Sequence, residues 1–400
     1  MTQLPLLPAH QMAQMIRTRQ ISALDLCDAH LEHIAQYNSK LNAICTLDEE
    51  NARSRAKAAD KALARGENWG ALHGVPVTIK DIFETAGLRT TAGYIPLENY
   101  QPKQDATVVA RLKSAGAIVL GKTNMAELGG DYQSTNSLFP RVNNPWNLSL
   151  TAGGSSGGSA AAIAAGLTPL DLGNDIAGSL RQPAHFCGVY TLKPTDRRIS
   201  TAGMIPEVPG MPYCLRQMIT VGGFGRSLQD VQLCFSLIAG ADPRRPDVPA
   251  VSLDSPTERS LQDLKIAWTD EWPEVPVATD IQTSMQGVLQ TLMSSGLQVE
   301  HWLPKCFDLS KIFNIYGRLA AYINIYAQPV NRHNIRHSFP ILFRSATQGD
   351  RDLRPLGNFS RFLPELLRPT LKGYFQALTE RDEFIGQLDM ALEDWDVWLT

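Results

Sequence analysis

The spacing of apolar and polar positions is helical at the start of the chain. After Ser22, the segment "LDLCDAHLEHIAQY" repeats its apolar residues at helical intervals, and Ser22 with Asp25 forms a capping-box pattern at its start. A second helix is predicted over "EENARSRAKAADKALARG", which Gly66 ends. We therefore expect residues 1–70 to be helices that pack on a core.

The pattern changes near residue 70, where short apolar and β-branched runs begin to alternate with helical segments. A layered α/β core with some parallel strand pairing follows from this alternation, and we place it at residues 71–245. The predicted strands are "HGVPVTIKDIF", "AIVLGKTN" and "TPLDLGND", and the predicted helices are "DATVVARLKSAGA", the alanine-rich stretch after "GGSSGG" and "LQDVQLCFSLIAG".

The last predicted region, residues 246–400, begins with a proline-rich connection. Two strands, "DLKIAWTDEW" and "LQVEHWLP", flank the helix "DIQTSMQGVLQTLMSSG". Several helices are predicted over 306–385, including "LSKIFNIYGRLAAYINIYAQ" and "FLPELLRPTLKGYFQALTE".

Composition narrows the class of protein. The 400 residues are 44% hydrophobic and 19% charged, as in an ordinary globular chain, and the net charge of −3 argues against nucleic-acid binding. The six cysteines form no CxxC pair, which favours a reducing compartment and gives no metal site. No apolar run is long enough to span a membrane. We expect a cytoplasmic protein, with a homodimer left open.

Two short strings match known motifs, one for nucleotide binding and one for serine hydrolases, but the elements predicted around them do not fit either motif. "GAIVLGKT" matches the phosphate-loop string, but its middle residues are those of a strand and the helix precedes it. "GSSGG" matches a nucleophile elbow, but the preceding "NNPWNLSLTA" is turn-like rather than a strand. His185 is the nearest histidine, and we interpret it as a buried core residue.

The remaining candidates for chemistry are one lysine and several serines. Lys80 ends a buried β-branched run, where a lysine loses its proton readily and can act as a general base. The alternative is that Lys80 pairs with Asp81 at the strand end, and spacing leaves both interpretations open. The glycine- and serine-rich stretches "GGSSGGSAAA" and "GNDIAGSLRQPAHFCG" predict either a phosphate cradle or serine chemistry.

Four long motifs, in order and at matching spacing, decide between these alternatives. "GVPVTIKD", "AGAIVLGKTNMAE", "NPWNLSLTAGGSSGGSAAAIAAG" and "LGNDIAGSLRQPAHFCGVYTLKPT" closely resemble the amidase signature family. The resemblance runs from about Ser22 to Ala241. It implies an α/β amidase-signature fold, which is a large mixed β-sheet covered by helices on both faces, with a helical region on the substrate side.

The resemblance also implies a catalytic triad and no metal or organic cofactor. Ser179 takes the place of the acylated nucleophile, Ser155 that of a bridging serine after a cis peptide, and Lys80 that of the base. Backbone N–H groups of residues 176–179 would form the oxyanion hole. By position, the oxyanion-hole residues are Ile176, Ala177, Gly178 and Ser179, and the supporting residues are Ser156, Asp175 and Arg181.

The function implied is hydrolysis of a small linear carboxylic amide to an acid plus ammonia or an amine, through an acyl-enzyme on Ser179. One alternative is the A-type subunit of an amidotransferase, which releases ammonia from glutamine within a tRNA-dependent complex. Another is an inactive binding protein with the same fold. The segment "EVPGMPYCLRQMITVG" favours the stand-alone amidases. The substrate is not readable from residues 203–223 and 306–345, where the acyl pocket is expected.

The chain departs from the family pattern at several positions. Ala177 stands where the family has glycine, which would strain the backbone if that position needs a positive φ. Asn174 replaces a serine or threonine, and Pro140 replaces a glycine. "DWDVWLT" resembles a strand after which the family continues, so we expect the chain to end before the usual C-terminal segment.

Overall fold

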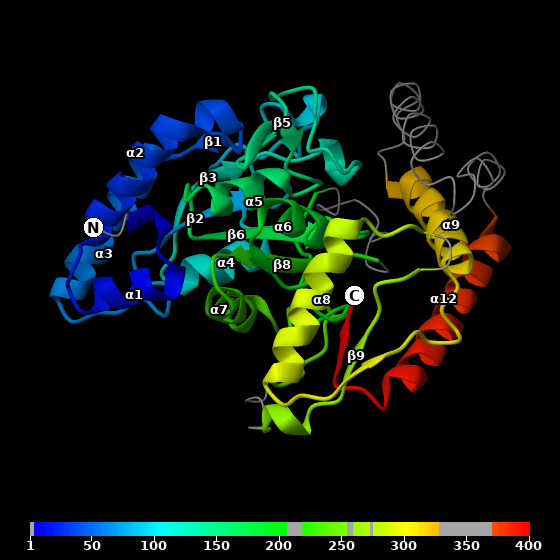
Figure 1. Cartoon of the computed structure of the whole chain (residues 1–400). Helices are drawn as coiled ribbons and strands as arrows, with labels where there is room; N and C mark the ends of the chain where they lie inside the picture. The colour runs from blue at the N-terminus through cyan, green and yellow to red at the C-terminus, as the bar shows by residue number, and fades with distance from the viewer. Residues whose placement is uncertain (1–3, 206–217, 254–258, 273–274, 328–369) are drawn as a thin grey trace. The chain divides into compact units, whose positions relative to one another are not determined.

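A computed structural model describes residues 4–205, 218–253, 259–272, 275–327 and 370–400 (Figure 1). The chain divides into two units, Met1–Leu253 and Asp254–Thr400, and each is described here by itself. The predicted subdivision of the first unit at residue 70 stays a prediction.

The first unit is built on a six-stranded sheet with the strand order β1-β3-β2-β6-β8-β7. β2 runs parallel to β3 and β6, whereas β1, β7 and β8 pair antiparallel with their neighbours. The mixed sheet of the predicted amidase-signature fold is therefore confirmed. Its strands are β1 (Ile44–Leu47), β2 (Pro76–Lys80), β3 (Ile118–Thr123), β6 (Leu170–Asp175), β7 (Tyr190–Thr191) and β8 (Thr220–Gly225).

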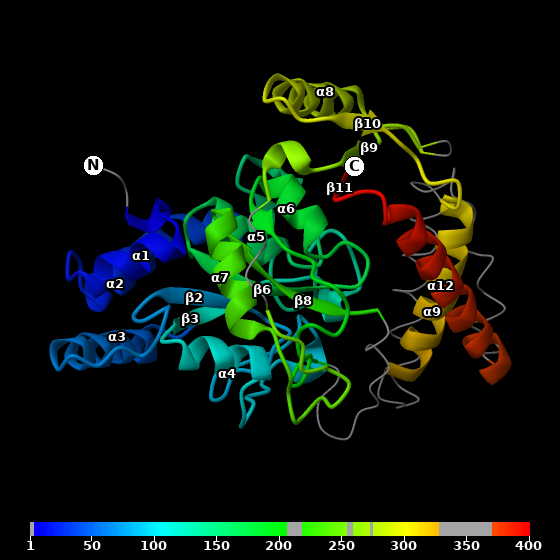
Figure 2. The ribbon, with the colours of Figure 1, turned by 90° about the horizontal axis from the view of Figure 1, so that it is seen from below.

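Helices cover both faces of this sheet, as Figure 2 shows. Helix α5 packs against five of the six strands, and α7 packs against β7 and β8. A Cβ added to Gly223 would meet Cys234 of α7, whereas one added to Gly222 would meet Leu180 beside α6. Because neighbouring residues of a strand point to opposite faces, α7 and α6 lie on opposite sides of the sheet. The helices are α1 (Ala9–Arg17), α2 (Ala23–Leu41), α3 (Glu49–Ala64), α4 (Thr107–Ser114), α5 (Gly157–Ala164), α6 (Arg181–Cys187) and α7 (Leu228–Ile238).

Most predicted elements form where the sequence placed them. The Ser22 side chain accepts a hydrogen bond from the Asp25 N–H at the start of α2, so the predicted cap is present. All five residues of β2 are buried, which fits the β-branched run that precedes Lys80. "GAIVLGKT" contains strand β3, as predicted, and has no phosphate loop.

Other elements were not predicted because their sequences carry weak signals. The "turn-like" segment before the glycines is a small hairpin of β4 (Asn143–Asn144) and β5 (Asn147–Thr151). The Asn144 side chain fixes it by donating to the carbonyls of Thr151 and Phe186. Strand β8 is rich in glycine, which disfavours strands in general but here allows α7 to lie directly on the backbone.

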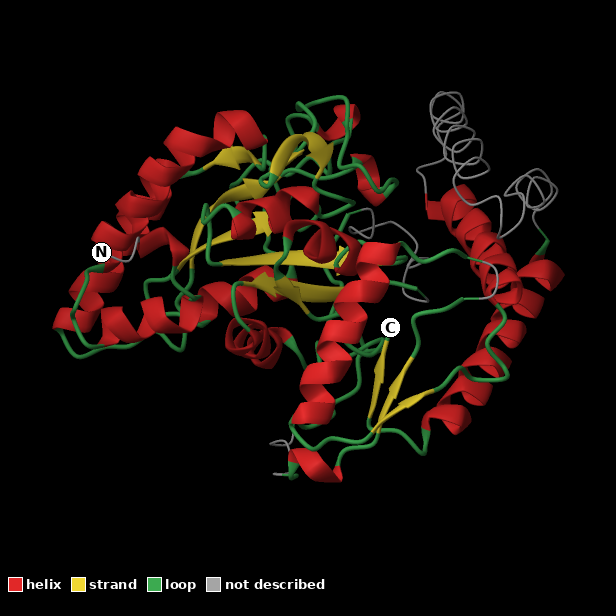
Figure 3. Cartoon of the chain, in the orientation of Figure 1, coloured by secondary structure: helices red, strands yellow, loops and turns green. Residues whose placement is uncertain are grey.

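The second unit has its own three-stranded parallel sheet, ordered β10-β9-β11, with helices around it (Figure 3). An aromatic cluster packs on Trp398 of β11, whose ring centroid lies 5.4 Å from that of Trp302 and 5.7 Å from that of Phe307. The predicted strands and helices of this region are confirmed within the described residues, and part of "FLPELLRPTLKGYFQALTE" lies outside them. The elements are β9 (Ile266–Trp268), α8 (Thr279–Ser294), β10 (Val299–His301), α9 (Leu309–Ala327), α12 (Leu371–Leu392) and β11 (Val397–Leu399).

A glycine in α5 gives a test of this packing. A Cβ at Gly158 would lie 2.2 Å from the Asn124 carbonyl oxygen and 2.6 Å from that of Ala43, so Gly158→Ala should lower the free energy of unfolding by about 1–3 kcal/mol. Gly287 in α8 meets nothing, and Gly287→Ala should instead raise it by about 0.5–1 kcal/mol. Urea denaturation measures both. Equal stability of Gly158→Ala and the wild type would contradict the close approach of α5.

Candidate active site

Lys80 is a fully buried lysine at the end of β2. Its Nζ lies 2.8 Å from Ser155 Oγ, 2.8 Å from Ser156 Oγ and 2.7 Å from Asn174 Oδ1. Burial lowers the pKa of Lys80 to about 7, while the charges of Asp175 and Asp171 raise it in part. Near neutral pH, Lys80 can therefore both accept and return a proton.

The ion pair between Lys80 and Asp81 is not formed. The Asp81 carboxylate accepts hydrogen bonds from the Thr91 N–H at 3.0 Å and from the Thr91 hydroxyl at 2.5 Å. Lys80 instead has two hydroxyls and an amide oxygen as partners. Of the two interpretations that spacing left open, pairing with Asp81 is therefore wrong, and the role of Lys80 as a general base stays a prediction.

The two serines beside Lys80 lie in the glycine-rich turn between β5 and α5. The Gly154–Ser155 peptide bond is cis, as the family resemblance implied. Gly153 has a φ of +82°, and a Cβ on Gly154 would lie 2.6 Å from the Tyr132 carbonyl carbon, so glycine is required at both positions. The turn brings Ser155 and Ser156 to the same distance from Lys80 Nζ, and that distance does not distinguish their roles.

Ser179 lies in the loop that follows β6 and is 7% exposed. Asp175 organises this loop by accepting hydrogen bonds from the Gly178 N–H at 2.8 Å and the Leu180 N–H at 3.1 Å. The Arg181 guanidinium makes two further bonds to the same carboxylate, at 2.8 and 3.0 Å. Although burial alone would raise the pKa of Asp175, these donors hold it below its usual value.

The structure does not link Ser155 to Ser179. Among the residues that it describes, the Ser179 hydroxyl has no hydrogen-bond partner. Lys80, Ser155 and Ser156 are therefore brought together, and Ser179 lies in the loop after the neighbouring strand β6 without the hydrogen bond that a proton relay needs.

The sequence comparison identifies the family. A family model described as Amidase matches residues 25–343. The chain belongs to the amidase signature family. The A subunit of glutamyl-tRNA(Gln) amidotransferase from Roseiflexus castenholzii (strain DSM 13941 / HLO8) is 39% identical to it over 302 residues, which is 75% of this chain and 60% of that protein. The chain thus spans less than two thirds of the length of this curated relative.

Solved structures of the amidase signature family have the same fold. The A subunit of glutamyl-tRNA(Gln) amidotransferase from Thermotoga maritima matches with a TM-score of 0.75 and 25% identity, over 100% of this chain and 80% of that chain. A bacterial aryl acylamidase of the family matches with a TM-score of 0.79 over 98% of this chain and 79% of that chain. At 23% identity, the second likeness shows the fold alone.

The alanine that departs from the family pattern is not strained. Ala177 does not adopt a positive φ, and in this loop the positive φ of +118° falls on Gly178. The strain expected if Ala177 needed such a conformation is therefore absent. The Tyr132 hydroxyl donates to the Ala177 carbonyl oxygen at 3.2 Å, so the Ala177–Gly178 peptide is held at its C=O by Tyr132 and at its N–H by Asp175.

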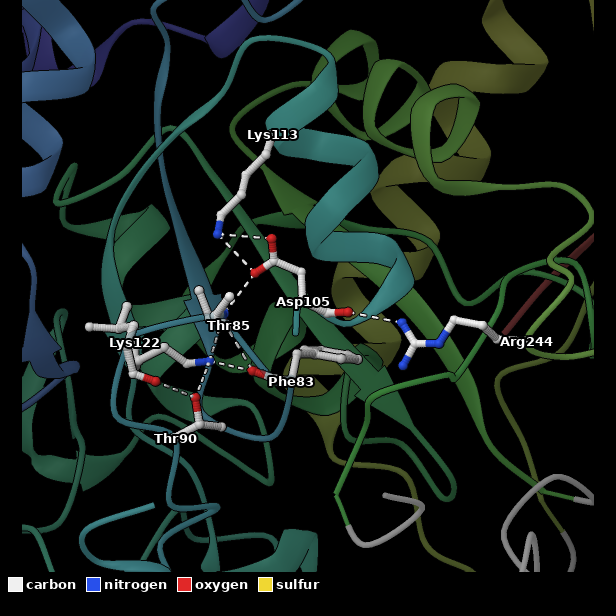
Figure 4. A network of polar contacts seen from close by, with 9 residues as sticks. Phe83, Thr85, Thr90, Asp105, Lys113, Lys122 and Arg244 are labelled. Atoms are coloured by element: carbon white, nitrogen blue, oxygen red, sulfur yellow. Dashed lines mark hydrogen bonds and ion pairs between the residues drawn. The ribbon is translucent and has the colours of Figure 1, made fainter. Parts of the chain in front are cut away.

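A second buried lysine lies on the neighbouring strand. Lys122 of β3 is fully buried, and its Nζ donates to the Phe83 carbonyl oxygen and to the hydroxyls of Thr85 and Thr90 (Figure 4). Burial lowers its pKa to about 8. The sequence showed Lys122 as part of a strand, but gave no sign that its ammonium would be buried.

The structure also bears on the expectations for His185, membrane spans, metal ligands and the acyl pocket. His185 is exposed on α6, so its interpretation as a buried core residue was wrong, because the helix turns it away from the sheet. No helix in the described ranges is long and apolar enough to cross a membrane. Within those ranges, no group of three metal-ligating side chains is placed to hold an ion. The acyl pocket was expected at residues 203–223 and 306–345, and of these residues 206–217 and 328–345 lie outside the described residues.

Replacing Lys80 with methionine tests its lowered pKa. The unfolded lysine has a pKa near ~10.4 and Lys80 one of about 7, so the unfolded state binds more protons and the wild type loses stability as the pH falls from about 10 to about 7. The gain in free energy of unfolding on Lys80→Met should therefore be about 3 kcal/mol larger at about pH 7.5 than at about pH 10. Urea denaturation at both pH values measures it, and a gain independent of pH would mean that Lys80 stays charged in the fold.

Proposed function

We propose that this protein hydrolyses a small linear carboxylic amide through an acyl-enzyme on Ser179. The observation that carries the proposal is the buried Lys80, whose Nζ lies 2.8 Å from the Ser155 hydroxyl and whose pKa is about 7. A general base works best when its pKa is close to the working pH. Membership of the amidase signature family supports the same reaction class.

In the proposed reaction, the Ser179 oxygen attacks the carbonyl carbon of the amide. The Ser179 proton passes to the Ser155 oxygen while the Ser155 proton passes to Lys80, and the reverse transfer protonates the leaving amine as the C–N bond breaks. Water then attacks the ester by the same route and releases the acid. For this path the Ser179 hydroxyl must come within hydrogen-bonding distance of Ser155, and we expect substrate binding to bring it there.

The oxyanion would be stabilised by backbone N–H groups of the loop after β6. Because the Gly178 N–H already donates to Asp175, we correct the predicted donor set for this conformation to Ile176, Ala177 and Ser179. Asp175 and Arg181 then act as supports that fix the loop. One oxyanion donor is typically worth about 3–4 kcal/mol to the transition state.

The proposal also includes the expectations on partner, location and cofactor. The partner is a small-molecule amide rather than a nucleic acid, and the protein works in the cytoplasm without a cofactor. The homodimer and the boundaries at residues 70 and 245 stay predictions.

A second candidate function is favoured by the relatives. The curated relative from Roseiflexus castenholzii, at 39% identity, is named as the A subunit of glutamyl-tRNA(Gln) amidotransferase. In this alternative the same residues would release ammonia from glutamine within a tRNA-dependent complex. The segment that favours the stand-alone amidases, "EVPGMPYCLRQMITVG", lies mostly outside the described residues. Hydrolysis of glutamine that depends on a co-purifying protein would select this alternative, and hydrolysis of aryl or aliphatic amides by the chain alone would select the first.

Labelling with an alkyl fluorophosphonate tests the nucleophile and the base. Intact mass spectrometry should show one adduct and peptide mapping should place it on Ser179. Lys80→Ala should slow labelling by about 10²–10⁴-fold, because the proton acceptor is lost. Lys113→Ala is the matched control, since Lys113 pairs with Asp105 away from the serines, and it should label as the wild type does. An adduct on another residue would refute the assignment of Ser179.

The two serines beside Lys80 are separated by the same assay. Ser155→Ala should slow labelling strongly, whereas Ser156→Ala should have a milder effect, because only Ser155 takes part in the proposed relay. The comparison is matched, since both hydroxyls lie 2.8 Å from Lys80 Nζ. The reverse order would make Ser156 the bridging serine.

A further inference from the structure

Asp171 is a fully buried carboxylate in the middle of the sheet that the proposed reaction does not use. It lies on β6, where it pairs with Thr78 of β2. The Thr78 hydroxyl donates to Asp171 Oδ2 at 2.5 Å, and the Thr123 hydroxyl donates to Oδ1 at 3.4 Å. Ser159 of α5 lies next to Thr123, with their hydroxyl oxygens 3.0 Å apart. Hydroxyl groups of β2 and β3 therefore hold a carboxylate inside the core, and α5 supplies a third hydroxyl beside that of Thr123.

The sheet places Asp171 on the same face as Lys80. Thr78 and Lys80 are two residues apart on β2, so their side chains point to one face, and Asp171 is the strand partner of Thr78. Lys122 is the partner of Ile79 and therefore points to the opposite face. Helix α5, which carries Ser159 and follows Ser155 and Ser156, covers the face that Asp171 and Lys80 share.

The charges around Asp171 come from four elements. Lys80 of β2 and Lys122 of β3 are the cations, Asp175 is the second carboxylate of β6, and Cys234 of α7 is a thiol. Burial raises the pKa of Cys234 to about 12, so that thiol stays neutral. Burial also raises the pKa of Asp171 to about 6, while the nearby hydroxyls of β2, β3 and α5 and the charge of Lys122 lower it in part.

We propose that Asp171 is a positioning residue that sets the proton affinity of Lys80, and through it the pH at which the Lys80–Ser155 pair takes up a proton. The proposal rests on the proposed function for the role of Lys80 as base. An ionised Asp171 favours the ammonium form of Lys80, because opposite charges inside a protein are weakly screened. The hydroxyls of Thr78 and Thr123 keep this negative charge in the core although no cation is within ion-pair distance of it among the described residues.

Removing the charge of Asp171 should change the pKa of Lys80 in one direction only. Without the negative charge of Asp171, burial of Lys80 is opposed only by Asp175, and the pKa of Lys80 must fall. Asp171→Asn keeps the shape of the side chain and removes its charge. The low-pH limb of the reaction should therefore move to lower pH in this variant.

The first experiment measures Lys80 without any catalysis. The full chain is labelled with carbon-13 at lysine Cε, the Lys80 signal is assigned by its loss in Lys80→Met, and its titration is followed by NMR. The midpoint should fall by about one pH unit in Asp171→Asn. Asp230→Asn removes a different fully buried carboxylate, which contacts His10, and should leave the midpoint unchanged. An unchanged midpoint in Asp171→Asn, or an equal shift in Asp230→Asn, overturns the proposal.

The second experiment follows the pH dependence of Ser179 labelling by the fluorophosphonate. For a shift of one pH unit, the labelling rate well below the midpoint, relative to its plateau, should be about tenfold higher in Asp171→Asn than in the wild type. A shifted NMR midpoint without labelling of wild-type Ser179 would refute the proposed function and leave the electrostatic link standing. Labelling with an unshifted pH profile would overturn the link and leave the proposed function standing.

A second variant covers the case in which Asp171→Asn does not fold. Thr78→Val keeps the carboxylate and removes the donor at 2.5 Å, which raises the pKa of Asp171 and leaves it neutral over a wider pH range. The Lys80 midpoint should then move in the same direction as in Asp171→Asn. A midpoint equal to that of the wild type would count against the proposal.

Discussion

The burial of one ammonium group is the constraint on which the rest of this site depends. Lys80 has no contact with solvent, and among the described residues no carboxylate lies within ion-pair distance of it. Burying a charged ammonium group in this way costs several kcal/mol of folding free energy. Because this cost applies only to the charged form, the pKa of Lys80 falls to about 7. The neighbours that remain are neutral oxygens of two serines and Asn174. Such neighbours can hold either protonation state, which a direct carboxylate partner would not allow.

The glycines of the first unit follow from the same constraint. To bring two serine hydroxyls onto a lysine in the middle of a sheet, the backbone before α5 must lie against its neighbours. The places of Cβ atoms at Gly154 and Gly158 are taken by backbone atoms of residues 131–133, 43 and 124. Gly173 of β6 likewise leaves room beside Ser156, whose hydroxyl a Cβ there would approach to 3.1 Å. The glycine content that a phosphate loop could also explain is therefore needed for packing around Lys80.

The sequence predicts the elements whose signals are local, and misses features that depend on register. The Ser22 cap, the buried run of β2 and the helix after the glycines could all be recognised from neighbouring residues. Strand β8 could not be recognised in this way, because its glycines are explained only by the close packing of α7, which follows it in the chain. The Lys80–Ser155 contact was foreseen only through four family motifs, since 75 residues separate the partners. Asp171 lies outside the four family motifs and Lys122 lies inside one, but no pattern of neighbouring residues shows that either side chain is buried, which becomes visible only when the sheet order is known.

The two buried lysines differ in the groups that their ammonium nitrogens contact. Both have lowered pKa values, about 7 for Lys80 and about 8 for Lys122, so proton affinity alone does not separate them. Their partners do. Lys122 binds a carbonyl oxygen and two threonine hydroxyls in residues 83–90, on the other face of the sheet. Lys80 binds two serines of the turn before α5, and under the proposed function one of these hydroxyls passes the proton to and from Ser179. A buried lysine becomes a base when the hydroxyl that it contacts can pass the proton on.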